Sequence, residues 1–325
     1  MPLTREEILA NDGDPAILDR LDIRNQNGHI LVKFGLGYEL FVAPRGRMTL
    51  REEMLEAERK YYETFKDKLT HLLLPEQRRA PAIKGDPFER FYREHKKTPA
   101  LNGFSARLFF EPTPPEIPSE PTQYFIEFLV SREDDNRLSF INAYMPVGDS
   151  QNDYNFNSLL EHVLHSSKLL KPVHGVAGFS LIFEAGLEQN AKYAYSTMKR
   201  HPGLEFIDAV SFSIEVKSQF HRIKGVNWLT ILGSEVLQEL GGIESARAAL
   251  EPDCILHEYD GGVVIQAGPV PQLGNSYHNL IPQRYRKVAQ FTRPVRFEDY
   301  RSSLFRVFPP LDGPTEAVSW VRRFD

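Results

Sequence analysis

The apolar residues of this 325-residue chain come in short runs, and their length constrains the fold more than any other feature. Two of the longest runs, Gly262–Ile265 and Leu181–Phe183, are the size of one β-strand. A helix that crosses a membrane needs about 18 or more consecutive apolar residues, and the sequence has no run of that length. The runs alternate with stretches of helical periodicity and with turns rich in glycine and proline, which is typical of helices packed on a sheet.

These patterns place strands and helices along the chain. We predict strands over residues 104–110, 123–130, 138–145, 173–183, 225–232, 254–259 and 263–267. We predict helices over residues 4–11, 49–74, 88–93, 153–170, 189–200, 235–240, 243–250, 282–291 and 315–324. The first helix begins at a capping box formed by Thr4 and Glu7. The strands between residues 104 and 145 follow one another directly, so we expect an antiparallel meander there.

A β-hairpin is predicted over residues 28–44. Two apolar runs, His29–Phe34 and Tyr38–Val42, flank the tripeptide Gly35-Leu36-Gly37. Because glycine adopts the backbone angles of tight turns without steric cost, this centre favours a turn between two strands. A second hairpin, with Asp260-Gly261 as its turn, is predicted between the strands at 254–259 and 263–267.

The fold class predicted from this order is α/β, of the α+β type, with mixed, largely antiparallel sheets flanked by helices. Single cores stop growing at roughly 250 to 300 residues, so residues 1–325 suit one unit. The unit comprises the first hairpin and long helix (1–75), an irregular connection (75–102), a further α/β region (about 103–297) and a tail helix (315–324). Each half offers strands with one long helix, which leaves two similar lobes open as an alternative.

The start of the chain and its cysteine content predict a cytoplasmic protein. Glu6 and Glu7 stand where a secretory signal has basic residues followed by an apolar run. The lone Cys254 can form no internal disulfide, which agrees with a reducing compartment, and we expect it to be a small buried residue. The net charge of −5 gives no general attraction to nucleic acid or to anionic membranes.

No pattern in the sequence points to chemistry. His162, His165 and His174 suggest part of a metal site, but they lack the spacing and the glutamate of a zinc-protease helix, so we interpret them as structural. Ser180 and Ser213 are predicted inside apolar strands, where a hydroxyl is structural. Phosphate-binding, dinucleotide-binding and nucleophile-elbow motifs are missing from the sequence. We therefore expect no catalytic, cofactor-binding or metal-binding residues, no cofactor and no enzymatic activity.

Charge is distributed unevenly along the chain. Residues 111–153 hold nine acids and two arginines, a local charge of −7. Residues 278–311 hold seven bases and two acids, a local charge of +5. We interpret five of these bases as part of a solvated helix face: Arg284, Arg286, Lys287, Arg293 and Arg296. The acids stand at predicted turns and loops, where a charged side chain serves solubility or reaches a basic partner.

One part of the sequence resembles a known family. The segment Gly225–Gly233 is a strand that runs directly into a helix ending at Leu240-Gly241-Gly242. Further motifs follow in order: Gly261–Pro269, Gly274-Asn275, Tyr285–Ala289 and Pro294–Arg296. This order resembles the type VI secretion immunity protein family, which is found beside effectors of that secretion system. The likeness is close over about residues 225–297 and extends in element order back to about residue 100.

These motifs are scaffold. We expect Trp228 to be buried, and Gly241 and Gly261 to stand at the end of a helix and of a hairpin. The resemblance implies a protein that binds a cognate toxin inside the producing cell and occludes its active site, without chemistry of its own. A toxin that needs a cytosolic antidote attacks a cytosolic target, so we expect a nuclease or an ADP-ribosyltransferase.

An acidic surface can fill the basic cleft of such a toxin. Our candidate partner-binding residues are therefore acids at predicted turns and loops: Glu133, Asp134, Asp135, Asp149 and Asp153. Two other functions remain as alternatives: an adaptor or chaperone that loads an effector, and a small ligand-binding protein or enzyme with an unrecognised pocket.

Overall fold

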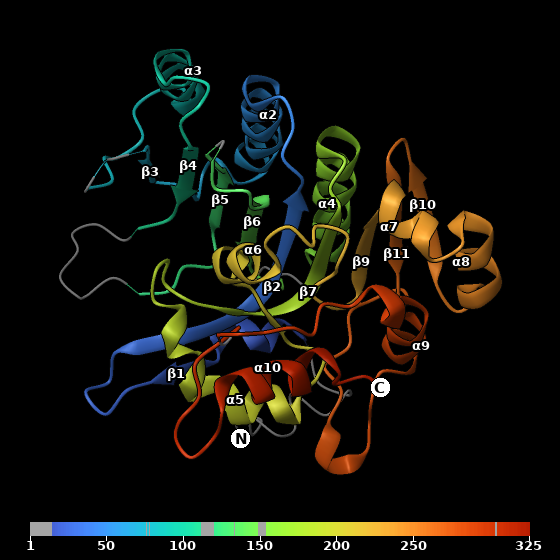
Figure 1. The fold of residues 1–325 in the computed structure, drawn as a ribbon. Helices are drawn as coiled ribbons and strands as arrows, with labels where there is room; N and C mark the ends of the chain where they lie inside the picture. The colour runs from blue at the N-terminus through green and yellow to red at the C-terminus, as the bar shows by residue number, and fades with distance from the viewer. Residues whose placement is uncertain are drawn as a thin grey trace.

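One large sheet runs through both halves of the chain (Figure 1). The computed structural model describes residues 15–75, 77, 79–111, 120–132, 134–148, 154–302 and 304–325, so the predicted capping box at Thr4 lies outside it. The sheet has 11 strands in the order β10-β11-β9-β7-β2-β6-β5-β4-β3, with β1 on β2 and β8 on β7. Among the described residues, every strand pair is antiparallel except β7 with β8, so the predicted fold class is confirmed.

The strands have the following bounds: β1 Asp22–Arg24, β2 Ile30–Val42, β3 His71–Leu73, β4 Phe104–Phe109, β5 Phe125–Val130, β6 Ser139–Met145, β7 His174–Ile182, β8 Glu205–Phe206, β9 Leu229–Gly233, β10 Ile255–Tyr259 and β11 Gly262–Gln266. The α-helices are α2 Arg47–Phe65, α3 Pro87–Lys97, α4 Phe156–Leu170, α5 Ala191–Arg200, α6 Ala209–Val216, α7 Ser234–Glu239, α8 Gly242–Leu250, α9 Gln283–Thr292 and α10 Gly313–Val321. The 3₁₀ turns are η1 Pro15–Arg20, η2 Glu188–Asn190, η3 Ser276–His278 and η4 Arg293–Val295.

The hairpin predicted at residues 28–44 is wrong, because β2 is one continuous strand at the centre of the sheet. Its glycines make room for neighbours instead of forming a turn. A Cβ at Gly35 would lie 2.8 Å from the carbonyl oxygen of Met145 on β6, and one at Gly37 would lie 2.6 Å from the side chain of Ile207. Both distances are shorter than real Cβ contacts, so a larger residue would push β2 away from what packs on it.

The antiparallel meander is confirmed as β4, β5 and β6, which pair in order on one side of β2. The other side of β2 carries β7, β9, β11 and β10. The hairpin of β10 and β11 turns at Asp260-Gly261 as predicted, and Gly261 has a φ of +133°. The predicted burial of Trp228 is also confirmed, since its exposed fraction is 1%, and Cys254 is buried.

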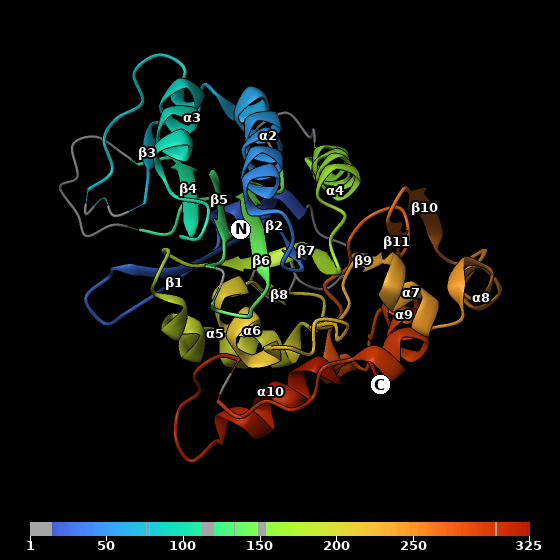
Figure 2. The ribbon, with the colours of Figure 1, turned by 45° about the horizontal axis from the view of Figure 1, so that its top comes forward.

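Helices cover both faces of the sheet. Figure 2 shows α2, α3 and α4 on one face and α5, α6 and α10 on the other. The long helix predicted to reach residue 74 ends at Phe65 instead, and residues 71–73 form the edge strand β3. Leu69 and Leu72 continue the apolar pattern of α2 and are buried, but a turn after Phe65 redirects the chain into the sheet. None of the described helices is long and apolar enough to cross a membrane.

Helix α6 is absent from the elements that we predicted, and it corrects the placement of Ser213. This serine lies on α6 and donates to the carbonyl oxygen of Val210, whereas Ser180 lies in β7 as predicted. Asp208 caps the helix by accepting from the backbone nitrogen of Ser211 at 2.9 Å. The apolar run around Phe212 is compatible with a strand or a helix, and the N-cap at Asp208 favours the helix.

Candidate partner-binding surface

The turn between β5 and β6 carries the acids that the sequence singled out, and two of the five can be described. Asp134 is exposed on this turn, and Asp135 accepts from the guanidinium of Arg137, with 2.8 Å between Oδ2 and Nη2. Glu133, Asp149 and Asp153 lie outside the described residues. The structure thus places one exposed carboxylate and one paired carboxylate at this turn.

Some acids of the segment 111–153 lie close to bases that come from other parts of the chain. Lys33 on β2 lies 3.7 Å from the carboxylate of Glu120. Arg107 on β4 donates to Glu127 at 2.9 Å through its Nε. Bases from other segments therefore offset acids that a count along the sequence leaves unpaired.

Asp135 borders a hollow of about 610 Å³ at the end of the meander. Its charged lining is mixed, with Glu94 and Asp135 against Lys97, Arg132 and Arg137. Ser105 and Leu129 also line it, and both residues line a second hollow of about 360 Å³ further along β4 and β5. The two hollows are therefore neighbours on one surface.

We call the second hollow the sheet-face groove. It is lined by Ser105, Arg107, Glu127, Phe128, Leu129, Phe140, Gly186, Glu188, Asp208, Val210 and Ser211. Its floor is the face of β4 and β5 that points away from α2 and α3. Its wall comes from the loop before η2 and from the start of α6, which packs against β6 and β2.

Strand alternation explains why this face stays open. On β4 the side chains of Phe104, Ala106 and Leu108 are buried, whereas those of Ser105 and Arg107 between them are only partly buried. Successive side chains of a strand point to opposite faces, so the partly buried set looks into the groove. Arg107 is directly opposite Glu127, which is directly opposite Asn142 on β6, so these three side chains share one row.

The groove carries more negative than positive charge. Three carboxylates, those of Glu127, Glu188 and Asp208, line it together with one guanidinium, that of Arg107. Burial raises the pKa of Glu188 above its ordinary value, and the charges of Asp208 and Glu127 raise it further. Backbone hydrogen bonds of Gly186 and Glu188 act in the opposite direction and lower this pKa. With three carboxylates and one guanidinium, the lining of the groove has an excess of negative charge.

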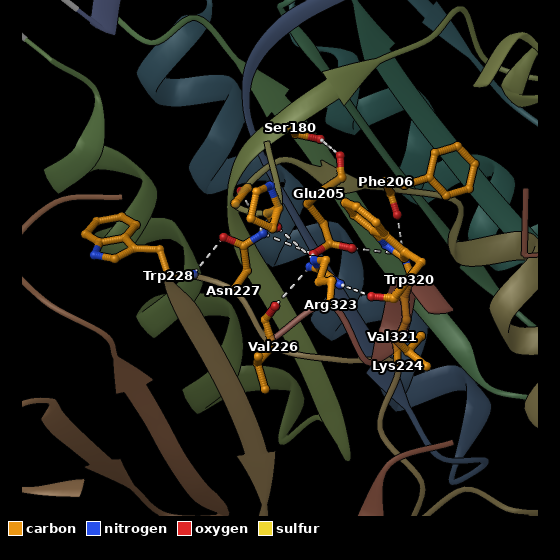
Figure 3. Close-up of polar contacts among 12 residues, drawn as sticks. Ser180, Glu205, Phe206, Lys224, Val226, Asn227, Trp228, Trp320, Val321 and Arg323 are labelled. Atoms are coloured by element: carbon orange, nitrogen blue, oxygen red, sulfur yellow. Dashed lines mark hydrogen bonds and ion pairs between the residues drawn. The ribbon is translucent and has the colours of Figure 1, made fainter. Parts of the chain in front are cut away.

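A second group of charges is fully buried beneath the same sheet face. We call Glu39, Glu205, Lys224 and Arg323 the buried ion cluster. Lys224 forms an ion pair with Glu39 and lies 3.7 Å from Glu205, and Arg323 donates to Glu205 at 2.8 Å. Figure 3 shows Glu205, Asn227 and Arg323 turned toward one another, and Asn227 donates to Glu205 at 3.0 Å.

The buried ion cluster joins distant parts of the chain. Glu39 comes from β2, Glu205 from β8 and Arg323 from the end of α10. Arg323 also donates to the backbone oxygens of Pro202 and Val226. With two acids and two bases, this cluster is balanced, and its contacts are those of a structural lock on the C-terminal helix.

Of the histidines considered as metal ligands, His162 and His165 lie on α4, whereas His174 lies on β7. His162 lies on α4 against the ring of Tyr61, with 5.5 Å between the ring centroids, and burial lowers its pKa to about 4. His174 lies in β7, stacks on Phe41, and has a pKa lowered by burial to about 3. Within the described part of the chain, no three histidine, cysteine or acidic side chains are grouped to hold a metal ion.

Two of the five bases that the sequence placed on a solvated helix face, Lys287 and Arg296, form ion pairs. Lys287 pairs with Asp253 at 2.6 Å. Arg296 is buried, which corrects its predicted place on a solvated face, and its two Nη atoms donate to the carboxylate of Asp325 at 2.7 Å each. Asp325 is thereby held beside Arg296, which directly follows η4. Figure 1 marks this C-terminal end near α9.

Comparisons with known proteins agree with this architecture and with the resemblance noted in the sequence. A Pseudomonas aeruginosa T6SS protein, PA0821, has a similar structure, with a TM-score of 0.79 and 21% identity over 94% of this chain and 87% of that chain. No curated protein sequence matches significantly. The fold class is thus one already seen in a type VI secretion protein.

The family follows from the sequence match. The model of the TsiV family, described as type VI immunity for VRR-NUC, matches residues 53–324, and the chain belongs to this family. The match extends well beyond the segment 225–297 that carried the resemblance.

Proposed function

We propose that this chain is a cytoplasmic immunity protein that binds a VRR-NUC nuclease effector of a type VI secretion system and occludes its active site. The observation that carries the proposal is the family match over residues 53–324, whose description pairs type VI immunity with VRR-NUC. The same description favours a nuclease over an ADP-ribosyltransferase as the toxin.

The charge of the candidate surface supports this proposal. A nuclease binds the phosphate backbone of nucleic acid through basic side chains. Asp134 on its turn and the carboxylates of the sheet-face groove are negative groups on neighbouring parts of one surface. Complementary charges speed encounter and oppose competing partners of like charge.

Co-expression with a VRR-NUC effector nuclease from the same genome tests the function. We expect restored growth, co-purification of the two proteins, and loss of DNA cleavage by the purified nuclease as immunity protein is added. Co-purification without any loss of cleavage would support the adaptor or chaperone alternative. Normal cleavage and no complex would contradict the immunity assignment for that nuclease.

The turn acids can be tested in the same assay. Neutralising Glu133, Asp134 and Asp135 together, as E133Q, D134N and D135N, should slow association and weaken protection while stability stays nearly unchanged. Steering accelerates association by roughly 10 to 1,000 times at low salt, so most of the loss should appear in the association rate.

A matched variant changes the same charge near the distant β10–β11 hairpin. Asp253, Glu258 and Asp260 are exposed acids that pair with surface bases, and D253N, E258Q and D260N remove three negative charges there. The control should keep most of the association rate. Equal salt dependence of association in the turn variant and the unmodified protein would place the contact elsewhere.

A further inference from the structure

A slot of about 20 Å³ adjoins the sheet-face groove, since the two share several lining residues. Glu127, Glu188 and Asp208 line both the groove and the slot. Asn142 lines the slot but not the groove. The slot holds roughly the volume of one water molecule, so only the tip of a side chain can enter it. The wider groove above it, of about 360 Å³, has room for the rest of that side chain.

Asn142 is the observation that points to a ligand. Its exposed fraction is 5%, and its Oδ1 has no hydrogen-bond partner among the described residues. A buried amide oxygen without a partner destabilises a protein unless a ligand or water satisfies it. The atom that fills the slot must therefore be a hydrogen-bond donor.

The surrounding carboxylates define that donor further. Glu127, Glu188 and Asp208 are also acceptors, and they already accept from Arg107, from the backbone nitrogen of Gly186 and from Ser211. The one guanidinium beside them, that of Arg107, lines the groove and not the slot. The raised pKa of Glu188 reflects burial and the charges of Asp208 and Glu127, which a cation would offset. The excess of negative charge favours a cationic donor with several N–H groups over a neutral one.

The apolar lining selects among cations. Phe140 and Val210 line both the slot and the groove, so they can pack against an aliphatic stem in the groove whose charged end reaches the acceptors. Within the described residues, no three carboxylates are close enough to hold a metal ion. A guanidinium has five donors in one plane and is weakly hydrated, so it suits a narrow site lined by several acceptors better than an ammonium does.

We propose that the slot and the sheet-face groove above it bind an arginine side chain presented by a segment of the partner protein. The guanidinium donates to Oδ1 of Asn142 and to the carboxylates of Glu127, Glu188 and Asp208, and its stem packs along Phe140 and Val210. The identity of the partner as a nuclease effector rests on the proposed function, whereas the chemistry of the site rests on this chain alone.

The first experiment uses the full chain and short peptides. Acetyl-Gly-Arg-Gly-amide is titrated against the side-chain amide NMR signals, among which that of Asn142 is assigned by its loss in Asn142→Leu. We expect millimolar binding that shifts this signal, and binding weaker by roughly 10 to 100 times in Glu188→Gln, because a hydrogen bond to a charged group is lost. Peptides with citrulline or lysine in place of arginine should bind more weakly.

A matched control is Glu94→Gln, which removes one carboxylate from the neighbouring hollow without touching the slot. It should bind the arginine peptide as the unmodified protein does. No shift of the Asn142 signal with the arginine peptide, or equal binding of the citrulline peptide, would overturn the proposal. If Asn142→Leu fails to fold, Glu188→Gln still decides, since its binding loss needs no signal assignment.

The second experiment separates this inference from the proposed function. Inhibition of the nuclease is compared for the unmodified protein, Asn142→Leu and Glu188→Gln, and we expect the variants to need roughly 10 times more protein for the same inhibition. Full inhibition by both variants would remove the groove from the interface while the immunity function stands. Binding of the arginine peptide without inhibition by the unmodified protein would keep the site and contradict the proposed function.

Discussion

Two groups of charges lie on one face of the sheet, and they differ in how far their charges are balanced. Arg107, Glu127, Asn142 and Glu39 are successive cross-strand neighbours on β4, β5, β6 and β2. At the Glu39 end, the row is covered and belongs to the buried ion cluster, with two acids and two bases. At the Glu127 end, this row of side chains lines the groove, which contains three acids and one arginine.

This difference in charge balance separates charges that stabilise the fold from charges that are available to bind a partner. Burial of an ion is costly, and only a paired and hydrogen-bonded charge is tolerated in the interior. In the buried ion cluster every charge faces a charge of opposite sign within the chain, although Oε2 of Glu39 has no hydrogen-bond partner among the described residues. In the groove, three carboxylates share the single guanidinium of Arg107, and Oδ1 of Asn142 in the adjoining slot has no hydrogen-bond partner among the described residues.

The largest effect is expected when the buried ion cluster loses a base. Lys224→Met leaves the carboxylates of Glu39 and Glu205 buried with only Arg323 to compensate them. Removing one partner of a buried ion pair destabilises by about 3 to 5 kcal/mol, and we expect the upper end here because two acids face the lysine. The free energy of unfolding from urea titration measures it.

The matched control for this variant is Lys287→Met. Lys287 forms an ion pair with Asp253 at the surface, and such pairs contribute about 0 to 1 kcal/mol. Similar unfolding free energies for Lys224→Met and the unmodified protein would show that the buried ion cluster is not a structural lock.

The packing beside the cluster gives the next largest effect. Trp228 follows Asn227 directly, its exposed fraction is 1%, and its indole nitrogen donates to the carbonyl oxygen of Gly268 at 2.9 Å. Trp228→Ala should cost about 3 to 5 kcal/mol, because it removes a large buried ring and leaves a cavity. An unchanged melting temperature would contradict the assignment of this segment as core.

Local patterns in the sequence predicted most of the elements, and the errors have a common physical cause. The meander of β4, β5 and β6 was found because its turns are polar and its runs are short. The hairpin at residues 28–44 was wrong because Gly35 and Gly37 serve close contacts with Met145 and Ile207, which are distant in sequence. A glycine needed for space looks the same in sequence as a glycine needed for a turn.

The candidate site was less predictable than the fold. The excess of acids in residues 111–153 pointed to a segment that lines part of the groove, but the groove also needs Glu188 and Asp208 from the second half of the chain. The ion pair between Glu127 and Arg107 could not be predicted from the sequence either, because the two residues meet only when β4 pairs with β5. One signal was present: Glu39 and Glu127 each interrupt an apolar run, which marks an acid with a specific partner.

The pH dependence of stability tests the burial of Glu39 in the buried ion cluster. Burial raises the pKa of Glu39 from 4.5 to about 7, although Lys224 lowers it, so the folded chain binds a proton there that the unfolded chain releases. The stability contributed by this proton is complete below pH 4.5 and is lost as the pH rises through about 7. Relative to Glu39→Gln, the unmodified protein should therefore lose stability between pH 5 and 7.5. A constant difference in unfolding free energy across this range would contradict the raised pKa.

The smallest effect on stability is expected in the groove, and it completes the contrast with Lys224→Met. Glu188→Gln removes a carboxylate whose pKa is raised by burial and by repulsion from Asp208 and Glu127. Because Glu188 forms no ion pair with a base among the described residues, the change should leave the unfolding free energy within about 0.5 kcal/mol at pH 7 or raise it slightly. The same variant should weaken partner binding, so stability and binding move independently. A loss of several kcal/mol would instead mean that Glu188 holds the fold, and that the groove and the buried ion cluster do not differ in role.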